Sequence, residues 1–485
     1  MTAAGGLALL GGGGWAASEL LSGTAGVRRL PSFLSGATTP ARHFHTRPDL
    51  KPSAVAVSGA SDQPGYLLVA PSWSNVTHAG RLILDGHGEP VWYAPYPLFG
   101  LATNLKVQSY RGQPVLTWWE GIVVDYYGQG EGVIADTSYR ELVRVRAANG
   151  RRMDLHEFRL TPEGTAVFTC FPQTVQLDAS SLGGPSDLRV LESVVQEVDV
   201  RTGRLLLEWR SLDHIDPSES YNPMGDPWDL IHANSVAVTA DGHLLVSCRE
   251  TWTLYKLDRR TGAVVWRLGG RRSDFAMGRG AQFSWQHHAQ PVSDRITVFD
   301  NAYDGKHRSL SQSRAILLDV DETRRTVELG RSYTHPKPLS SGAEGSAQLL
   351  PDGHVLVGWG FPGYTSEYAS DGTLVADAHF VARTSSYRAF RMPWHGHPHE
   401  KPAIALRSDP ATGKQTVYAS WNGATEVRSW RVHAGPDRRD LPAVGVAQRR
   451  GFETAIPLGR ASGHVAVSAL DAAGNVLARS RALRL

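Results

Sequence analysis

A two-strand phrase recurs six times along the chain, and it constrains the fold more than any other feature. Each copy has an alternating apolar run, a turn rich in Asp, Gly, Thr or Arg, and a second apolar run. The copies occupy residues 80–93, 132–146, 196–210, 254–269, 315–330 and 365–380. Apolar alternation around such a turn is typical of a β-hairpin. A repeat of this size built from strands alone predicts an all-β fold, a β-propeller with six blades.

A second pattern marks the first hairpin of each repeat. A tight turn is followed by four apolar residues at 111–119, 163–171, 241–249, 294–301 and 352–360, and PGYLLVAP at 64–71 represents the first repeat. The turn carries Gly112, Gly164, Gly242 and Gly353, because glycine adopts left-handed backbone at least cost, and Arg295 takes this place in the fifth repeat. The blades are therefore expected over roughly 60–100, 101–150, 151–215, 228–270, 283–335 and 340–385.

The C-terminal part of the chain departs from the repeat. Residues 386–402 are expected to form a linker, and the alternating His395, His397 and His399 favour an exposed loop over a metal clip. Residues 416–435 and 464–483 are alternating strands unlike the blade phrase. They predict a small β-sandwich similar to a fibronectin type III module. The expected organisation is a catalytic propeller over 46–400 and a sandwich over 401–485.

The N-terminus is small and apolar over residues 1–18. It is similar to the hydrophobic part and cleavage region of an export signal, but lacks the preceding basic stretch. Residues 1–45 are expected to be a truncated export signal, the alternative being a disordered tail. The run is too short and too rich in glycine to span a bilayer, and no other segment is apolar enough. We expect an exported protein, extracellular or in the cell envelope, without an integral membrane span.

Composition excludes some functions. The 485 residues carry a net charge of +3 without a dense Lys/Arg cluster, so no nucleic-acid partner is expected. The two cysteines, Cys170 and Cys248, occupy similar strand positions in different repeats. Buried thiols are favoured over a disulfide, which would need their Cα atoms within roughly 7 Å.

Polar residues recur at one position of the repeat. Eight residues before the turn position the chain carries Asn104, His156, Asn234 and His287, whereas the last repeat has Gly345 there. Strand starts in a propeller core favour small apolar residues, so these polar residues indicate a function. Equivalent positions on different blades converge on the central channel of a propeller. The four side chains are therefore expected to meet.

Three further polar residues belong to the same predicted cluster. His232 lies two residues before Asn234 and therefore on the same strand face, while Arg249 and Asn301 follow the second strands of successive repeats. The cluster of three histidines, asparagine and arginine fits an anion with several oxygens and supplies a nucleophilic nitrogen. Three histidines also suit zinc, but an arginine in the same shell would repel a cation, and the cluster includes no carboxylate. No metal and no other cofactor is predicted.

Four phrases resemble a known family. They are LHEFRLTPEGTAVFT (155–169), WDLIHANSVAVTADGHLLVSCRETWTLYKLDRRTGAVVWRLGG (228–270), FSWQHHAQPVSDRITVFDNAYDG (283–305) and SYTHPKPLSSGAEGSAQLLPDGHVLVGWG (332–360). Together they are similar to the arylsulfotransferases, arylsulfate sulfotransferases that use no nucleotide sulfate donor. The resemblance implies a six-bladed propeller with its active site in the channel. It also implies transfer of a sulfuryl group from a phenolic sulfate ester to a phenol acceptor through a sulfohistidine.

The resemblance assigns roles to residues of this chain. His287 in FSWQHHAQ matches the family's nucleophile, although His288 follows it directly; the spacing favours His287. His232, Arg249 and His156 match the remaining catalytic positions. Asn234, Asn104 and Asn301 are expected to bind substrate.

The expected chemistry is a two-step transfer. Covalent transfer through His287 predicts ping-pong kinetics. The expected partners are an aryl sulfate donor and a phenolic acceptor, whose ring would stack on an aromatic residue near a strand end. The candidates for that stacking are Trp118, Trp119, Tyr126, Trp285 and Trp359. Two alternatives are a non-catalytic propeller that binds sulfated or phenolic ligands, and a metal-dependent lyase or hydrolase that uses the histidines.

Overall fold

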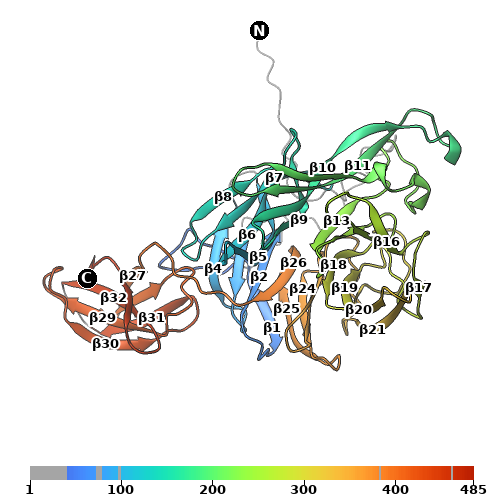
Figure 1. Cartoon of the computed structure of the whole chain (residues 1–485). Coiled ribbons are helices and arrows are strands. Elements are labelled where there is room, and N and C mark those ends of the chain that lie inside the picture. The colour runs from blue at the N-terminus through green and yellow to red at the C-terminus, as the bar shows by residue number, and fades with distance from the viewer. Residues whose placement is uncertain (1–40, 73–78, 97–99, 382–383, 460–462) are drawn as a thin grey trace, which may run out of the picture.

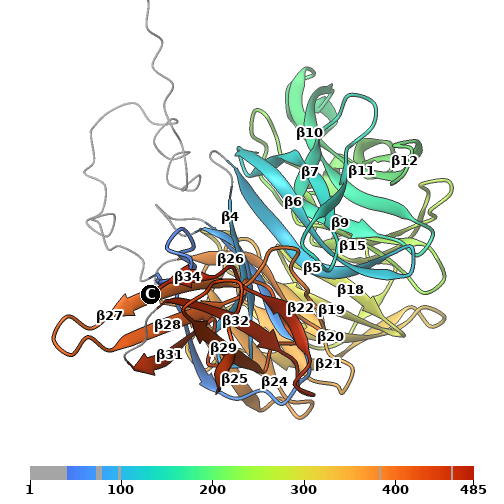
Figure 2. The same ribbon diagram turned by 90° about the vertical axis from the view of Figure 1, so that its left-hand side faces the viewer.

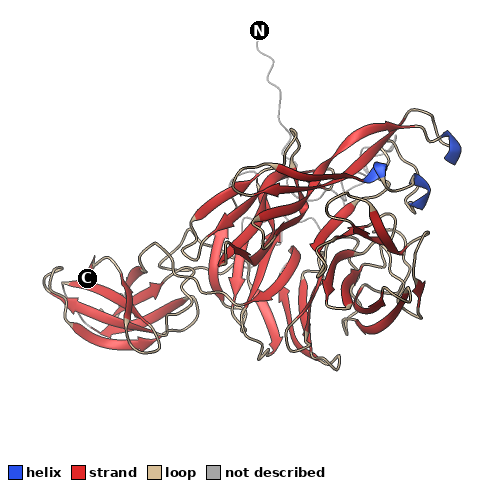
Figure 3. Ribbon diagram, viewed as in Figure 1, coloured by secondary structure: helices blue, strands red, loops and turns tan. Residues whose placement is uncertain are grey.

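The computed structural model describes residues 41–72, 79–96, 100–381, 384–459 and 463–485. The predicted export signal falls almost entirely on residues 1–40, outside the described residues. The described chain is all-β, as expected: Figure 3 shows strands throughout, with short helical turns at one end only. These turns are η2 (Ser180–Leu182), η3 (Ser211–Asp213) and η4 (Pro217–Glu219). Within these ranges no helix has the length and apolar character needed to cross a membrane.

Antiparallel meanders account for the predicted repeats. The first comprises β2 (Tyr66–Ser72), β3 (Gly80–Leu84) and β4 (Pro90–Pro95). The second and third comprise β5 (Leu101–Tyr110), β6 (Gln113–Val124), β7 (Tyr127–Ala135), β8 (Glu141–Val145), β9 (Met153–Leu160), β10 (Thr165–Leu177), β11 (Leu188–Asp199) and β12 (Leu205–Arg210). These eight strands form one sheet, because β7 also pairs with β9 at Gly130 and Met153.

The next three meanders form separate sheets (Figure 1). The fourth contains β13 (Ala233–Val238), β14 (Leu244–Cys248), β15 (Thr253–Leu257) and β16 (Val264–Gly269). The fifth contains β17 (Ala276–Met277), β18 (His287–Val292), β19 (Arg295–Asp300), β20 (Arg314–Asp321) and β21 (Thr326–Tyr333). The sixth contains β22 (Ser346–Leu349), β23 (Val355–Gly358), β24 (Tyr364–Tyr368) and β25 (Leu374–Phe380).

Two strands, β1 and β26, each pair with a strand from a distant part of the chain. The early strand β1 (Val55–Gly59) pairs with β25 at the edge of the sixth meander. The late strand β26 (Ser385–Met392) pairs with β2 and completes the first sheet in the order β26-β2-β3-β4. The interpretation of 386–402 as a linker is therefore wrong over its first residues. Only the pairing with β2 reveals β26, because its sequence lacks the repeat phrase.

Each meander has an inner strand that contacts the inner strand of the next. We use the name inner strands for β26, β5, β9, β13, β18 and β22. Contacts run from β26 to β5, β5 to β9, β9 to β13, β13 to β18, β18 to β22, and from β22 back to β26. Hydrophobic clusters fill the junctions between sheets: one cluster includes Val167, Trp209, Val236 and Tyr255, from the third and fourth meanders.

The turn glycines adopt the predicted backbone. Gly112, Gly164, Gly242 and Gly353 have φ between 74° and 89°. Arg295 does not share their place: it begins β19, and Ser293, with φ 56°, is the left-handed residue of that turn. Cys170 and Cys248 are free and buried, so the prediction of two buried thiols is confirmed.

The C-terminal segment forms two further sheets. One contains β27 (Ala403–Ser408), β28 (Gln415–Ser420) and β31 (Glu453–Gly459). The other contains β29 (Ser429–Gly435), β30 (Ala443–Gln448), β32 (His464–Leu470), β33 (Val476–Arg479) and β34 (Leu483–Arg484). One hydrophobic cluster that includes Val417, Trp430 and Val467 joins them. The two sheets lie beside the β2–β4 sheet (Figures 1 and 2). There the side-chain amide of Asn422 accepts from the backbone N–H of Tyr93 and donates to its carbonyl, both at 2.9 Å.

Gly345 provides a test of packing between the inner strands. A Cβ at Gly345 would lie 2.3 Å from the ring of the buried Phe299, whereas a Cβ at Gly164 would meet nothing within 4 Å. Both residues have positive φ, so an alanine costs about 1–2 kcal/mol at either position. We expect Gly345→Ala to lower the free energy of unfolding by about 1–3 kcal/mol more than Gly164→Ala, because of overpacking. Urea unfolding measures both, and equal losses would contradict the predicted clash.

Candidate active site

The inner strands are held in equivalent register by one repeated hydrogen bond. The backbone N–H of Ala289 donates to Ser235 Oγ (3.2 Å), that of Ala389 donates to Ser346 Oγ (3.1 Å), and that of Ala347 donates to His288 Nδ1 (3.3 Å). Because the bond is the same in each case, the residue directly before each acceptor (Asn234 before Ser235) and the residue two before each donor (His287 before Ala289) occupy equivalent places on their strands. We call this place the ring position. This rule assigns Asn234, His287, Gly345 and Tyr387 to the ring position.

Two asparagines extend the equivalence to the remaining inner strands. Asn234 Nδ2 donates to the carbonyl of Gln286, directly before His287 (2.7 Å), and Asn104 Nδ2 donates to the carbonyl of Leu155, directly before His156 (2.8 Å). The ring position therefore also holds Asn104 and His156. All four ring residues predicted from the eight-residue spacing occupy equivalent places, and Tyr387 is the member that the sequence analysis missed.

Local backbone irregularities accompany the ring position. The pairing register shifts at Thr103/Lys106, Ala233/Ser235 and His287/Gln290, as expected for β-bulges. Left-handed backbone also occurs there, at Asn104 (φ 58°), His232 (φ 54°) and Trp285 (φ 51°). Bulges re-aim side chains, and strained non-glycine residues gather at functional sites.

The imidazoles of His156 and His232 face each other. Their Nε2 atoms lie 3.2 Å apart. His156 Nδ1 lies 2.5 Å from Asp154 Oδ2, and His232 Nδ1 lies 2.6 Å from Asp229 Oδ2. A carboxylate only accepts, so each Nδ1 carries a proton. The two facing Nε2 atoms can then form a hydrogen bond to each other only when one of them also carries a proton.

The surroundings of this pair set its charge and orientation. Tyr127 donates to Asp229 at 2.9 Å, and its ring lies 4.7 Å from that of His232. Burial lowers the pKa of His156, while the neighbouring Asp154 opposes that effect. Both carboxylates stand close to their histidines in the sequence: Asp154 lies two residues before His156 on the same strand face, and Asp229 lies three residues before His232. The expectation that the cluster lacks a carboxylate is therefore wrong.

His287 is held as a neutral imidazole with a defined tautomer. Asn301 Nδ2 donates to the carbonyls of Ser341 (2.9 Å) and Glu344 (3.0 Å), so its Oδ1 faces His287 Nδ1 at 2.8 Å. His287 Nδ1 must therefore donate, and Nε2 keeps its lone pair. Burial lowers the pKa of His287 well below its usual value, and Arg249 lowers it further. Asn301, predicted to bind substrate, has its amide fully used in orienting His287.

Arg249 lies at the same end of the inner strands. Its Nη2 donates to the carbonyl of Gly342 (2.9 Å), and Nη1 pairs with Glu250. Burial raises the pKa of Glu250, although Arg249 opposes that effect. Asn234 and Asn104 each keep a buried side-chain oxygen without a partner in the described part of the chain. Arg249, His156 and His232 are all close enough to affect the pKa of His287, and Asn234 contacts the carbonyl of the residue directly before it, Gln286.

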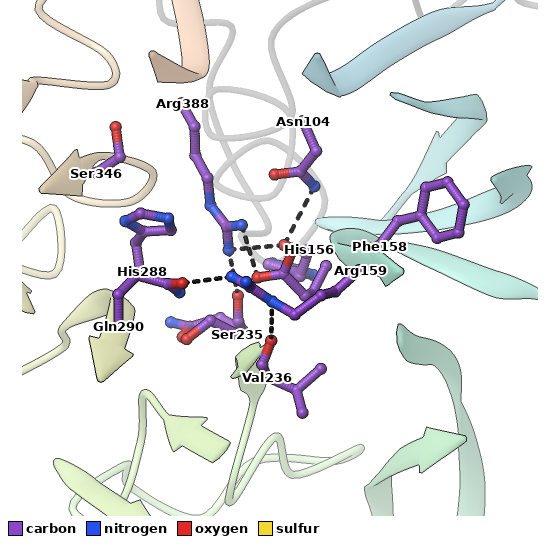
Figure 4. A network of polar contacts seen from close by, with 12 residues as sticks. Asn104, His156, Phe158, Arg159, Ser235, Val236, His288, Gln290, Ser346 and Arg388 are labelled. Atoms are coloured by element: carbon purple, nitrogen blue, oxygen red, sulfur yellow. Dashed lines mark hydrogen bonds and ion pairs between the residues drawn. The ribbon is translucent and has the colours of Figure 1, made fainter. Parts of the chain in front are cut away.

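A cationic layer lies next to the ring position and consists of Lys106, Glu157, Arg159, His288 and Arg388. Lys106 Nζ and Arg388 Nη1 each lie 2.7 Å from a Glu157 oxygen. Arg388 Nη2 also donates to the carbonyl of His156 at 2.8 Å (Figure 4). The same atom donates to the carbonyl of Asn234 at 3.0 Å, so Arg388 ties the inner strands β9 and β13 together. Burial lowers the pKa of Lys106 to about 8. His288 belongs to this layer, whereas His287 contacts Asn301.

Three aromatic side chains pack in a row that begins at Trp285, two residues before His287. Trp285 packs edge-on against Trp252 at 4.8 Å, and Trp252 stacks on Tyr221 at 3.8 Å. The backbone carbonyl of Trp285 lies 3.2 Å from His287 Nδ1. Of the other predicted stacking candidates, Trp118, Trp119 and Trp359 are buried in hydrophobic clusters. Tyr126 is half-buried in a turn with φ 73°.

The second group of histidines in the sequence lies at the surface. His395, His397 and His399 are exposed, as expected of a loop. Over the described ranges, no group of three or more His, Cys, Asp or Glu side chains is arranged to hold a metal ion.

Comparisons with known proteins agree with the sequence pattern. A family model described as "Arylsulfotransferase (ASST)" matches residues 106–381, more than half of the chain. Among curated proteins no sequence matches.

Solved structures give distant likenesses. A protein of unknown function from Bacteroides caccae has a TM-score of 0.41 at 14% identity, and the match covers 67% of this chain and 98% of that one. A virginiamycin B lyase from Staphylococcus aureus has a TM-score of 0.35 at 7% identity, with coverage of 76% and 97%. Likenesses of this size carry no functional information.

Glu157 tests the cationic layer. Burial alone would raise the pKa of Glu157, but Arg388, Lys106 and Arg159 hold it below its usual range. We expect Glu157→Gln to lower the free energy of unfolding by about 3–5 kcal/mol, because it leaves buried cations without a counter-charge.

The matched control is Glu141→Gln. Glu141 pairs with Arg144 at 2.6 Å, but its side chain is 41% exposed, so its loss should stay below about 1 kcal/mol. Urea unfolding compares the two variants, and equal losses would contradict the role of Glu157.

Proposed function

The chain belongs to the arylsulfotransferase family, and from this membership we propose that it is an arylsulfate sulfotransferase. It moves a sulfuryl group from a phenolic sulfate ester to a phenol acceptor through a sulfohistidine on His287. The observation that carries this proposal is the neutral His287, whose Nδ1 is held by Asn301 and whose Nε2 is left with its lone pair. A buried imidazole prepared in this way is a nucleophile.

The donor ester is held by positive charge and N–H groups. Arg249 supplies the charge that a sulfuryl group needs, and a guanidinium fork contacts two oxygens at once. Asn234 has one N–H committed to the carbonyl of Gln286 and one left for a ligand. Asn104, tethered to the carbonyls of Leu155 and His156, is proposed to line the same space. By analogy with phosphoryl transfer, such positioning and charge stabilisation supply most of the catalysis.

The first half-reaction transfers the sulfuryl group to the protein. The Nε2 lone pair of His287 forms the N–S bond while the bridging S–O bond breaks, and its electron pair stays on the departing phenolate. The His156–His232 pair gives its shared proton to that phenolate. In the second half-reaction the acceptor phenol returns a proton to the pair, its oxygen attacks sulfur, and the N–S bond breaks. Atoms and charge balance, and no cofactor takes part.

Finer features of the protein belong to the same proposal. The six inner strands and the pairing of β26 with β2 support a closed six-bladed propeller, in which the ring position lines the central channel. The phenol ring is proposed to rest against Trp285, beside Trp252 and Tyr221. The two C-terminal sheets support a fibronectin type III-like sandwich. The protein is proposed to be exported.

Release of a chromogenic phenol tests the reaction. We expect the wild-type protein to release 4-nitrophenol from 4-nitrophenyl sulfate beyond one equivalent per protein only when a phenol acceptor is present, with parallel lines in double-reciprocal plots. Release without an acceptor would indicate a sulfatase instead. No release under either condition, across several aryl sulfates, would contradict the proposed activity.

Trapping of the intermediate tests His287. Without an acceptor, 4-nitrophenyl sulfate should add the mass of one SO₃ group to the peptide that contains His287, as mass spectrometry at alkaline pH can detect. His287→Ala should lose both the label and the transfer. His335→Gln is the control, since His335 is a buried histidine that pairs with Asp377 away from the inner-strand ends. A label that survives in His287→Ala would place the nucleophile elsewhere.

The acidic limb of the pH profile tests the state of His287. Protonation blocks the nucleophile, and burial and Arg249 keep the pKa of His287 well below 6.5. We therefore expect kcat/KM to show no loss from His287 protonation above pH 6.5 and to fall only below it. Arg249→Met removes a charge that lowers this pKa, so its acidic limb should move to higher pH. An unchanged limb in that variant, measured over the same pH series, would contradict the assignment.

A further inference from the structure

Tyr387 occupies the ring position on the strand that the sequence analysis took for a linker. It lies on β26, and the pairing of β26 with β2 shifts in register between Ser386 and Ala389. The same kind of irregularity marks the ring position on β5, β13 and β18. Tyr387 also lies outside residues 106–381, which the family model matches, so the match assigns it no role.

The ring of Tyr387 lies close to two of the histidines. Its centroid is 5.7 Å from that of His156 and 6.5 Å from that of His287, and both contacts are edge-on, at 81° and 77°. The Arg388 guanidinium lies over the same ring, 5.2 Å from its centroid. Tyr387 thus adjoins both the proposed nucleophile and the proposed proton donor.

The hydroxyl of Tyr387 has no partner among the described residues, although the side chain is only 3% exposed. Other buried tyrosines satisfy theirs: Tyr255 donates to Glu219 (3.0 Å), and Tyr368 donates to the carbonyl of Thr334 (3.1 Å). A buried hydroxyl without a hydrogen bond is unfavourable and rare in native proteins, and it needs a specific explanation. A ligand oxygen in the space between the histidines supplies that explanation.

We propose that Tyr387 is a further catalytic residue, whose hydroxyl donates a hydrogen bond to an oxygen of the transferring sulfuryl group. The inference rests on the proposed function and adds a donor to Arg249 and Asn234. The sulfuryl oxygens gain negative charge as the group moves, so a fixed donor there stabilises the transition state more than the ground state.

The charge state of Tyr387 suits a donor rather than a base. Burial raises its pKa far above the usual value; Arg388 opposes this effect, while Asp154, Glu157 and Glu344 add to it. Tyr387 therefore keeps its proton through the reaction. The proton of the leaving phenolate still comes from the His156–His232 pair, and the hydroxyl of Tyr387 only donates a hydrogen bond.

A Tyr→Phe substitution at two positions tests the proposal. Tyr387→Phe should lower kcat for acceptor-dependent release from 4-nitrophenyl sulfate by roughly 100-fold, the usual effect of removing one such donor. Its melting temperature should stay equal or rise, because the lost hydroxyl had no protein partner. Tyr368→Phe, in β24, is the control: it should melt lower and keep wild-type kcat, because it loses a hydrogen bond away from the site.

Binding of inorganic sulfate gives a readout that does not depend on turnover. Sulfate should raise the melting temperature of the wild-type protein and of Tyr368→Phe, and the rise should be smaller for Tyr387→Phe. If the wild-type protein is active and the kcat of Tyr387→Phe is within threefold of the wild-type value, the role of Tyr387 is overturned, while the proposed function stands. If the wild-type protein transfers no sulfuryl group, the proposed function fails, and equal sulfate shifts in all three proteins would then overturn the Tyr387 site as well.

Discussion

Removal of ionisable groups from water is the constraint on which the candidate site depends. Five of the six inner strands carry a polar side chain at the ring position, and every buried charge near them needs a partner. His156 and His232 meet this demand with Asp154 and Asp229, and Arg249 meets it with Glu250 and a backbone carbonyl. The same pairing fixes which nitrogen of each imidazole is protonated. Burial is the largest influence that lowers the pKa of His287, and Asn301 holds its Nδ1.

The cationic layer contains buried ion pairs and also contacts the backbone of residues at the ring position. Glu157 holds Lys106 and Arg388, and Arg388 reaches the carbonyls of His156 and Asn234. Arg388 lies on β26, so the strand that completes the first sheet also holds the inner strands β9 and β13 in place. Some buried polar atoms remain unsatisfied at this level, including Tyr387 Oη and Asn234 Oδ1. Such atoms are expected where a protein is prepared for a polar ligand instead of for maximum stability.

Much of the fold was predictable because hairpins leave a local signal. Alternation and turn glycines identified the meanders, and the eight-residue spacing found Asn104, His156, Asn234 and His287 at equivalent places. The eight-residue spacing identified His287 in the fifth repeat, although Arg295, from which it was counted, lies in β19 instead of the turn. The repeat pattern did not reveal β26, because its pairing partner β2 lies more than 300 residues away in the chain. It also missed Asp154 and Asp229, because their role depends on which nitrogen of each histidine faces them.

The sequence alone determined the strand pattern, the repeat and the set of histidines, because each of these follows from residues close together in the chain. Only the tertiary structure decided which atoms meet. It set His156 Nε2 against His232 Nε2, used the amide of Asn301 to orient His287, and placed the ring of Tyr387 near the imidazoles of His156 and His287. These outcomes depend on the register between inner strands from distant parts of the chain. A shift of one residue in that register would turn every ring side chain to the other face.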